Sequence, residues 1–247
     1  KDNPRMLTSI NAAKTFTAVF AQQMSVKATL SPSGGGTMTV SPAKAAYLAG
    51  EKVTLTVNPT AGYDFVRWSD GKPENPRELS VSADVALKAI VEPKSSIVRF
   101  SGGSGAVADL TQKRVSYDCT YGELATCTRP GYTFAGWSTA ADGAVAYADG
   151  ALASNLTAVA GETVVLYAKW AANAYTVSFD ANGGEGTMDP QPFTYDVAAV
   201  LTVSAFTRAH YSFAGWSTTP GGVTAYADGV AVSNLTAEAD GSVALYA

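Results

Sequence analysis

The sequence has few of the side chains that most enzymes and nucleic-acid-binding proteins depend on. Its 247 residues include one histidine and two cysteines, and 15% are charged, with a formal net charge of −4. A mildly acidic chain with scattered lysines and arginines lacks the basic surface that would bind nucleic-acid phosphates. No Gly-x-Ser-x-Gly motif, phosphate-binding loop or paired-carboxylate arrangement is evident. We therefore expect neither a nucleic-acid partner nor an enzyme, and we predict no catalytic residue.

Long apolar runs are missing too. The longest, Val197 to Phe206, contains Thr and Ser and is about half as long as a membrane-spanning helix must be. No basic amphipathic stretch indicates binding to a membrane surface. We expect no membrane insertion within this chain. We interpret Lys1 as an internal start, so that any secretion signal or anchor would lie outside this stretch.

The single histidine indicates neither a metal site nor an acid–base catalyst, because both usually need a histidine with a partner nearby. His210 occupies the place that Gly131 has in another copy of a repeat described below, so we interpret it as a surface loop residue. The Asp-Gly pairs at 142–143, 149–150 and 228–229 lack the distal Glu of a calcium loop and are interpreted as turns. We predict no metal and no cofactor.

The two cysteines, Cys119 and Cys127, lie eight positions apart. They are too few for a structural zinc site, and they do not form a Cys-x-x-Cys redox pair. A local disulfide formed in an oxidising compartment is our preferred interpretation, and two separately buried thiols are the alternative. Closing so short a loop would stabilise the fold by about 2–3 kcal/mol at most.

What the sequence does have is a short aromatic segment, Tyr-x-Phe-x-x-Trp, that occurs three times. Tyr and Phe two positions apart point to one face of a strand. In two copies a Gly precedes the Trp, which favours a bulge. Each segment is predicted to be a central, bulged strand in the core of its own small domain, because aromatics dominate small cores; a sugar-stacking platform is the alternative for the tryptophans. The predicted core residues are Tyr63, Phe65, Trp68, Tyr132, Phe134, Trp137, Tyr211, Phe213 and Trp216.

Residues 23–93 contain the first aromatic segment and are named the first repeat, for which we predict an all-β unit. The segments 26–32 and 37–42 alternate around Ser33-Gly34-Gly35-Gly36, which predicts a hairpin. Further strands are predicted at 52–58, at the aromatic segment and in a closing hairpin at 79–91.

Residues 1–22 match the end of the first repeat, since Asn3-Pro4-Arg5 corresponds to Asn75-Pro76-Arg77. We interpret them as the last hairpin of a copy whose front is absent. After the first repeat, Glu92-Pro93-Lys94-Ser95-Ser96 is predicted to be a short linker that can bend.

Residues 96–170 and 174–247 are two copies of a second type of repeat, named the middle repeat and the last repeat. From the aromatic segment onward they align without a gap at a constant offset of 79 residues. Two strands, a crossover, the aromatic strand, a polar loop and a final strand suit a β-grasp arrangement. The crossovers at 119–127 and 197–206 could hold a short helix. Trp170 is expected to pack at a stiff, hydrophobic junction between the two repeats.

The last repeat resembles a Listeria–Bacteroides repeat, the B-repeat module of internalin-type surface proteins. The resemblance is carried by Val177 to Gly184, by Tyr211 to Thr218 and by the final Leu-Tyr-Ala. The middle repeat resembles a second copy, with Phe100-Ser101-Gly102-Gly103 where the family usually has Phe-Asp-Xaa-Asn-Gly-Gly. The first repeat and residues 1–22 resemble the divergent bacterial B-repeat, with Gly62-Tyr63-Asp64-Phe65 as its aromatic segment. The family supplies no general catalytic residue or ligand.

This resemblance implies a secreted or cell-wall-attached bacterial protein. The fold class we predict is mainly β with some α+β, in a tandem array of small β-grasp-like repeat domains. The last repeat stops at Ala247, where the middle repeat continues with Lys169-Trp170, so we expect a longer parent array. Its function would be that of a non-catalytic, extracellular stalk or spacer that presents an adhesive or enzymatic domain, with neighbouring repeats as its partners.

The alternative function is an adhesion module that binds a host protein or a glycan directly. Such a module would need an exposed apolar or aromatic patch. The long polar loops at 138–162 and 217–241 are the places where we expect it.

Overall fold

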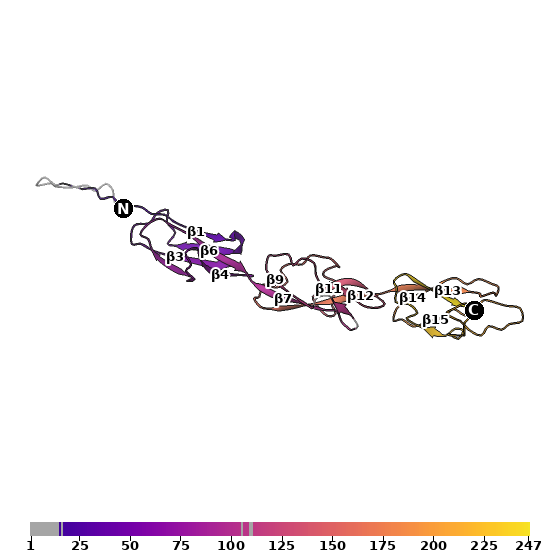
Figure 1. The fold of residues 1–247 in the computed structure, drawn as a ribbon. Coiled ribbons are helices and arrows are strands. Elements are labelled where there is room, and N and C mark those ends of the chain that lie inside the picture. The colour runs from indigo at the N-terminus through magenta and orange to yellow at the C-terminus, as the bar shows by residue number, and fades with distance from the viewer. Residues whose placement is uncertain (1–14, 16, 105, 109–110) are drawn as a thin grey trace. The chain divides into compact units, whose positions relative to one another are not determined.

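The computed structural model describes residues 15, 17–104, 106–108 and 111–247. Its regular elements are strands in several small sheets, with one short 3₁₀ helix at Ser33–Gly35 (Figure 1). The prediction of a mainly β chain built from small repeats is confirmed. The chain divides into two compact units, Lys1–Pro93 and Lys94–Ala247. The hairpin predicted at 1–22 falls largely outside the described residues, and the described stretch 17–22 forms no strand.

The first unit contains two three-stranded sheets. One sheet has the order β1-β6-β4, with β1 parallel to β6 and β4 antiparallel to it. The other has the order β2-β3-β5 and is antiparallel throughout. The strands are β1 (Val26–Ser31), β2 (Gly36–Ser41), β3 (Lys52–Pro59), β4 (Tyr63–Trp68), β5 (Arg77–Ser80) and β6 (Val85–Pro93).

Both hairpins predicted for the first repeat are therefore wrong, although the strands themselves lie close to the predicted positions. β1 and β2 belong to different sheets, and so do β5 and β6. The glycine-rich stretch between β1 and β2 crosses from one sheet to the other. Gly35 lies close to β6 at this crossing. A Cβ at this position would overlap with the side chain of Val91 on β6, so the crossing depends on the absence of a side chain at residue 35.

The core of the first unit takes side chains from both sheets. β3 alternates so that three apolar residues face inward, as the pattern of the segment predicts. The buried side chains include Val53, Leu55 and Val57 from β3, Trp68 from β4, and Ala89 and Val91 from β6. Asn75 extends the pairing of β3 with β5: its side-chain amide donates to the Val57 carbonyl and accepts from the Val57 N–H, both at 2.8 Å.

The middle repeat has a mixed four-stranded sheet of order β11-β12-β7-β9, whose central strands β12 and β7 are parallel. The last repeat has a three-stranded sheet of order β14-β13-β17, in which β13 and β17 are parallel. A two-stranded sheet accompanies each, β8 with β10 and β15 with β16. The strands are β7 (Ser95–Ser101), β8 (Val107–Ala108), β9 (Gln112–Ser116), β10 (Cys127–Thr128), β11 (Tyr132–Ser138), β12 (Thr163–Ala172), β13 (Ala174–Asp180), β14 (Gln191–Thr194), β15 (Ala199–Val200), β16 (Ala231–Val232) and β17 (Gly241–Tyr246).

Neither crossover of the second unit contains the short helix that we considered. In the middle repeat, Gly122 has a φ of +70°, which lies outside the right-handed helical region. In the last repeat, Val200 is paired with Ala231 in the small sheet formed by β15 and β16. Each crossover instead supplies buried apolar side chains, among them Leu124 and Leu201.

The aromatic segment is bulged in both repeats where it forms a strand. The register of β4 shifts between Phe65 and Arg67, and that of β11 shifts between Phe134 and Gly136. A bulge at these points turns the following Trp inward, as we predicted from the spacing. In the last repeat, residues 211–215 form no strand.

Successive repeats follow one another with almost no linker. Only Lys94 separates β6 from β7. The segment 92–96, which we predicted to be a linker, therefore consists of the end of β6, Lys94 and the start of β7. Only Asn173 separates β12 from β13. The second of these points lies inside the second unit.

Candidate functional site at the junction of two repeats

Asn173 uses all four of its hydrogen-bonding groups at the junction between the middle and last repeats. Toward the middle repeat, its N–H donates to the Gly131 carbonyl at 2.9 Å, and its Oδ1 accepts from the Thr133 hydroxyl at 2.7 Å. Toward the last repeat, its carbonyl accepts from the Tyr195 N–H at 2.9 Å, and its Nδ2 donates to the Ala237 carbonyl at 2.7 Å. Asn173 is buried, and its side-chain bonds to Thr133 and Ala237 are part-buried.

A second contact joins the same two repeats through Tyr132 and Asp196. The Tyr132 hydroxyl donates to Oδ2 of Asp196 at 2.6 Å. The Tyr132 ring meets the Tyr195 ring edge-on, with centroids 5.8 Å apart, and the Arg129 guanidinium lies 3.8 Å from the centre of the Tyr132 ring. We name this group, together with Asn173, the junction latch.

Asp196 is held in position by Asn234 from the polar loop of the last repeat. The Asp196 N–H donates to Oδ1 of Asn234 at 2.6 Å, and Nδ2 of Asn234 donates to Oδ1 of Asp196 at 2.7 Å. The middle repeat contains the same pair, Asp118 and Asn155, with distances of 2.6 and 2.8 Å. The repeated Tyr-Asp and Ser-Asn-Leu-Thr sequences are the signal that could have located this pair.

The hydrogen bond between Tyr132 and Asp196 shifts the pKa of both groups. The bond from the Tyr132 hydroxyl, followed by the bond from Asn234, lowers the pKa of the Asp196 carboxyl. The same bond raises the pKa of Tyr132, because removing its proton would place a second negative charge beside the carboxylate. At neutral pH, Tyr132 is therefore protonated and Asp196 is ionised, which are the states that form the hydrogen bond between them.

Gly131 allows the two repeats to come close. Its φ is +75°, and a Cβ at this position would overlap with the Tyr195 ring. The equivalent position in the last repeat is His210, which is exposed in a turn with a φ of +68°. His210 thus lies on the surface.

The three tryptophans of the aromatic segments are fully buried. Trp68, Trp137 and Trp216 are 0%, 1% and 0% exposed, which leaves no indole face for a sugar. Phe65, Phe134 and Phe213 are half-buried against them, with ring centres 5.6, 5.2 and 5.0 Å apart.

The three tyrosines have different environments, so the prediction that all three are core residues is wrong. Tyr63 is buried, whereas Tyr132 lies at the junction latch and Tyr211 is 69% exposed. β11 pairs with the end of β12 beside Tyr132, whereas residues 211–215 form no strand. Trp170 packs against Phe134 within the middle repeat rather than at the junction.

Cys119 is exposed, whereas Cys127 belongs to the buried core of the middle repeat. The disulfide between them stays a prediction. Among the residues that the structure describes, no group of His, Cys, Asp and Glu side chains is arranged to hold a metal ion. Within the same residues, no helix has the length and hydropathy needed to cross a membrane.

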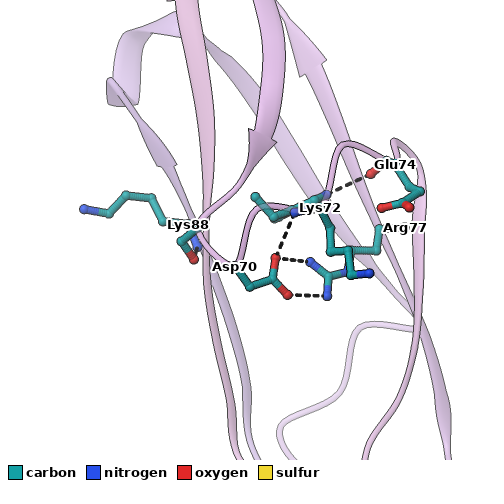
Figure 2. A network of polar contacts seen from close by, with 7 residues as sticks. Asp70, Lys72, Glu74, Arg77 and Lys88 are labelled. Carbon is teal, nitrogen blue, oxygen red and sulfur yellow. Dashed lines mark hydrogen bonds and ion pairs between the residues drawn. The ribbon is translucent and has the colours of Figure 1, made fainter.

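The first unit has a separate polar cluster, shown in Figure 2. The Arg77 guanidinium donates to both carboxylate oxygens of Asp70, at 2.7 and 2.6 Å. Lys72 N–H also donates to Asp70, and the Trp68 indole donates to the Glu74 carbonyl at 2.8 Å. Hydrogen bonding by Arg77 lowers the pKa of Asp70 to about 2. The cluster closes the turn between β4 and β5, and its contacts are structural.

Comparison with known families assigns all three repeats. The model of the Listeria-Bacteroides repeat domain matches residues 97–169 and 175–247. The model of the divergent InlB B-repeat domain matches residues 26–95.

Two similar proteins come from Evansella cellulosilytica. One is named a Gly-rich membrane protein and is 33% identical over 91 residues, which cover 37% of this chain and 10% of that protein. The other is named a membrane protein and is 28% identical over 197 residues, which cover 75% of this chain and 28% of that protein. The chain thus spans less than a third of either relative. Among solved structures, the Bacillus anthracis TIE protein aligns with a TM-score of 0.38 and 9% identity, over 92% of this chain and 50% of that one.

Proposed function

This chain belongs to the Listeria-Bacteroides repeat family, with a divergent InlB B-repeat ahead of its two family repeats, and we propose that it is a non-catalytic spacer at a bacterial cell surface. The spacer would hold an adhesive or enzymatic domain of its parent protein away from the cell. Its modules would be the first, middle and last repeats at 23–93, 96–170 and 174–247, and the last two of these would be β-grasp-like. The relatives named as membrane proteins support a surface location.

The observation that carries this proposal is the set of bonds around Asn173. A spacer must keep successive modules in a fixed relative orientation, because free rotation at each joint would let the array fold back. Two bonds of Asn173 go to the middle repeat and two to the last, so rotation at this residue would break hydrogen bonds of a buried residue. Each buried group left unpaired costs about 1–3 kcal/mol.

Within the junction latch, the contact between Tyr132 and Asp196 is a second point of attachment besides Asn173. Tyr132 and Asp196 meet through side chains rather than through the connecting backbone. Two separate attachments resist bending in a way that a single connecting residue does not. A compact module of about 75 residues is roughly 30 Å across, so two modules held end to end would span about 60 Å.

The proposal is tested by ¹⁵N relaxation of the full chain. If the latch is stiff, amides of the middle and last repeats will report one common rotational diffusion tensor. Asn173→Gly should give two separate tensors, because it removes both side-chain bonds and frees the backbone. Asn182→Gly is the matched control, since Nδ2 of Asn182 donates to the Ala247 carbonyl within the last repeat. Independent tumbling of the two repeats in the unmodified chain would contradict a stiff spacer.

A second candidate function, direct binding of a host protein, is favoured by the apolar side chains exposed on the polar loops. Leu152 and Val159 are 64% and 60% exposed in the middle repeat, and Val223 is 88% exposed in the last. Exposed apolar groups on long loops are common at protein-binding surfaces. Capture from host-cell extracts by the unmodified chain, and its loss in a Leu152→Ser, Val159→Ser and Val223→Ser variant, would support this function.

A further inference from the structure

The first and last strands of each repeat lie side by side and run in the same direction. β1 pairs with β6 in the first repeat, β7 with β12 in the middle repeat, and β13 with β17 in the last repeat, and each pair is parallel. The registers are unbroken over six, five and six residue pairs respectively. The two types of repeat share this pairing, although their other strands form sheets of different order.

The middle repeat shows how such a pair is loaded when the chain is pulled. The chain enters β7 at Ser95 and leaves β12 at Ala172. Parallel strands begin at the same end of a pair, and here the Ile97 N–H donates to the carbonyl of Glu162, just before β12, at 2.9 Å. The start of β7 and the end of β12 therefore lie at opposite ends of the pair. Tension along the chain slides the two strands past each other, so that the five residue pairs bear the load together.

Both strands of this pair are held on their other sides too. β7 pairs with β9 and β12 with β11, which places the pair at the centre of the four-stranded sheet. Val98 and Phe100 of β7 and Leu166 of β12 are buried in the core of the repeat. Sliding would bring these apolar side chains into contact with water, which the hydrophobic effect opposes.

We propose that the parallel pair formed by the first and last strands is a mechanical clamp, a set of hydrogen bonds that keeps each repeat folded under tension. The clamp rests on the spacer function, because a chain that joins a domain to a cell carries the force acting on that domain. It differs from the junction latch in what it resists. The latch fixes the orientation of neighbouring repeats, whereas the clamp resists extension of each repeat.

The test is force spectroscopy of the full chain with the middle repeat pulled in two directions. One handle is always attached at Glu92, and the other is attached at Ala174 in one variant and at Ala160 in the other; all three residues are exposed. Pulling from Ala174 shears the pair of β7 and β12. Pulling from Ala160 separates the starts of the two strands, so that the residue pairs open one after another. The handles are attached through azide-bearing residues, because the exposed thiol of Cys119 would react with a cysteine-directed handle.

The middle repeat is the only repeat between the handles in both variants, so each pull should give one main unfolding event. The length released, at roughly 3.5 Å per unfolded residue, shows that the repeat was folded before the pull. At equal pulling speed, we expect the unfolding force from Ala160 to be about twofold or more lower than from Ala174. The reason is that one residue pair at a time, rather than five together, bears the load.

Equal unfolding forces in the two directions would overturn the clamp. That result would leave the stiff spacer in place, because the spacer is tested by the rotational diffusion of the two repeats without load. Independent tumbling together with a direction-dependent force would do the opposite, since it would contradict the stiff spacer and support the clamp.

Discussion

The Tyr132 hydroxyl donates a 2.6 Å hydrogen bond to the Asp196 carboxylate, and the two residues belong to different repeats of the same unit. Tyr211 occupies the same place in the last repeat and has the same stacked arginine, with Arg208 4.4 Å from its ring centre. Tyr211 is nevertheless 69% exposed. The two tyrosines therefore provide a matched pair for testing the latch.

Tyr132→Phe should loosen the junction without unfolding either repeat. The substitution removes the hydroxyl that reaches Asp196 and keeps the ring against Tyr195. We expect the rotational diffusion of the middle and last repeats to separate in ¹⁵N relaxation. Tyr211→Phe removes a solvent-exposed hydroxyl from the same motif and should change nothing. An equal response of the two variants would show that the Tyr132 hydroxyl does not hold the junction.

Asn173→Ala should destabilise the second unit by about 1–3 kcal/mol, because it removes two part-buried hydrogen bonds, each of which contributes about 0.5–1.5 kcal/mol. Urea unfolding measures this loss. Asn182→Ala serves as the control, since it removes a bond inside the last repeat and should leave the relative orientation of the two repeats unchanged. If Asn173→Ala unfolds at the wild-type urea concentration, the junction does not depend on this side chain.

The stability of the junction should depend on pH at both extremes. The pKa of Asp196 is lowered in the folded state, so its contribution is present above the ordinary value of 3.8 and is lost as the pH falls below it. The pKa of Tyr132 is raised above 10, so its contribution is present below pH 10 and is lost as the pH rises through the folded value. ¹⁵N relaxation measured from pH 3 to pH 11 should show common rotational diffusion of the middle and last repeats between these limits and separate diffusion beyond them. Tyr132→Phe should abolish the change at alkaline pH.

Asp70 should make the first repeat sensitive to acid. Its pKa of about 2 lies below the ordinary 3.8, a difference equivalent to about 2 kcal/mol before solvent screening. Because the Asp70 side chain is 41% exposed, we expect a contribution of about 1 kcal/mol or less. It is fully present above pH 4 and is lost between pH 4 and pH 2. Unfolding of Asp70→Asn should lack this part of the acid dependence, and an unchanged profile would contradict the assignment.

Gly136→Ala should destabilise the middle repeat more than Gly150→Ala does. Gly136 has a φ of +131°, and a Cβ there would overlap with the Tyr147 carbonyl, which accepts the Trp137 N–H at 2.7 Å. Gly150 has a φ of +70° with open space around its Cβ position, so only the backbone cost of about 1–2 kcal/mol applies. Thermal unfolding compares the two, and equal midpoints would show that the close approach at Gly136 can relax.

Much of the fold could be predicted from local patterns. The inward face of β3 follows from alternation at Val53, Leu55 and Val57, and the bulges follow from the spacing of Phe and Trp. The partners of these strands could not be predicted in the same way. The glycine-rich stretch before Gly36 has the composition of a hairpin turn, but β1 pairs with β6, whose residues are far away in the sequence.

The site was harder to predict than the fold. Asn173 stands in an unremarkable Ala-Ala-Asn-Ala stretch, and its value lies in contacts with residues from both neighbouring repeats. The sequence does contain a signal for the Asp196–Asn234 pair, since the middle and last repeats both have an aspartate and an asparagine at these positions. The pattern alone did not connect those residues.

The sequence by itself determined that the chain is a series of small repeats, each with a tryptophan inside, because regular spacing of large apolar side chains is a local property. Only the tertiary structure decided what became of each tyrosine in the same motif. Tyr63 is buried, Tyr132 bonds to the next repeat and Tyr211 faces solvent. The reason is physical: the burial of a side chain depends on which strand or module lies against it, and that partner is brought there by the folded chain.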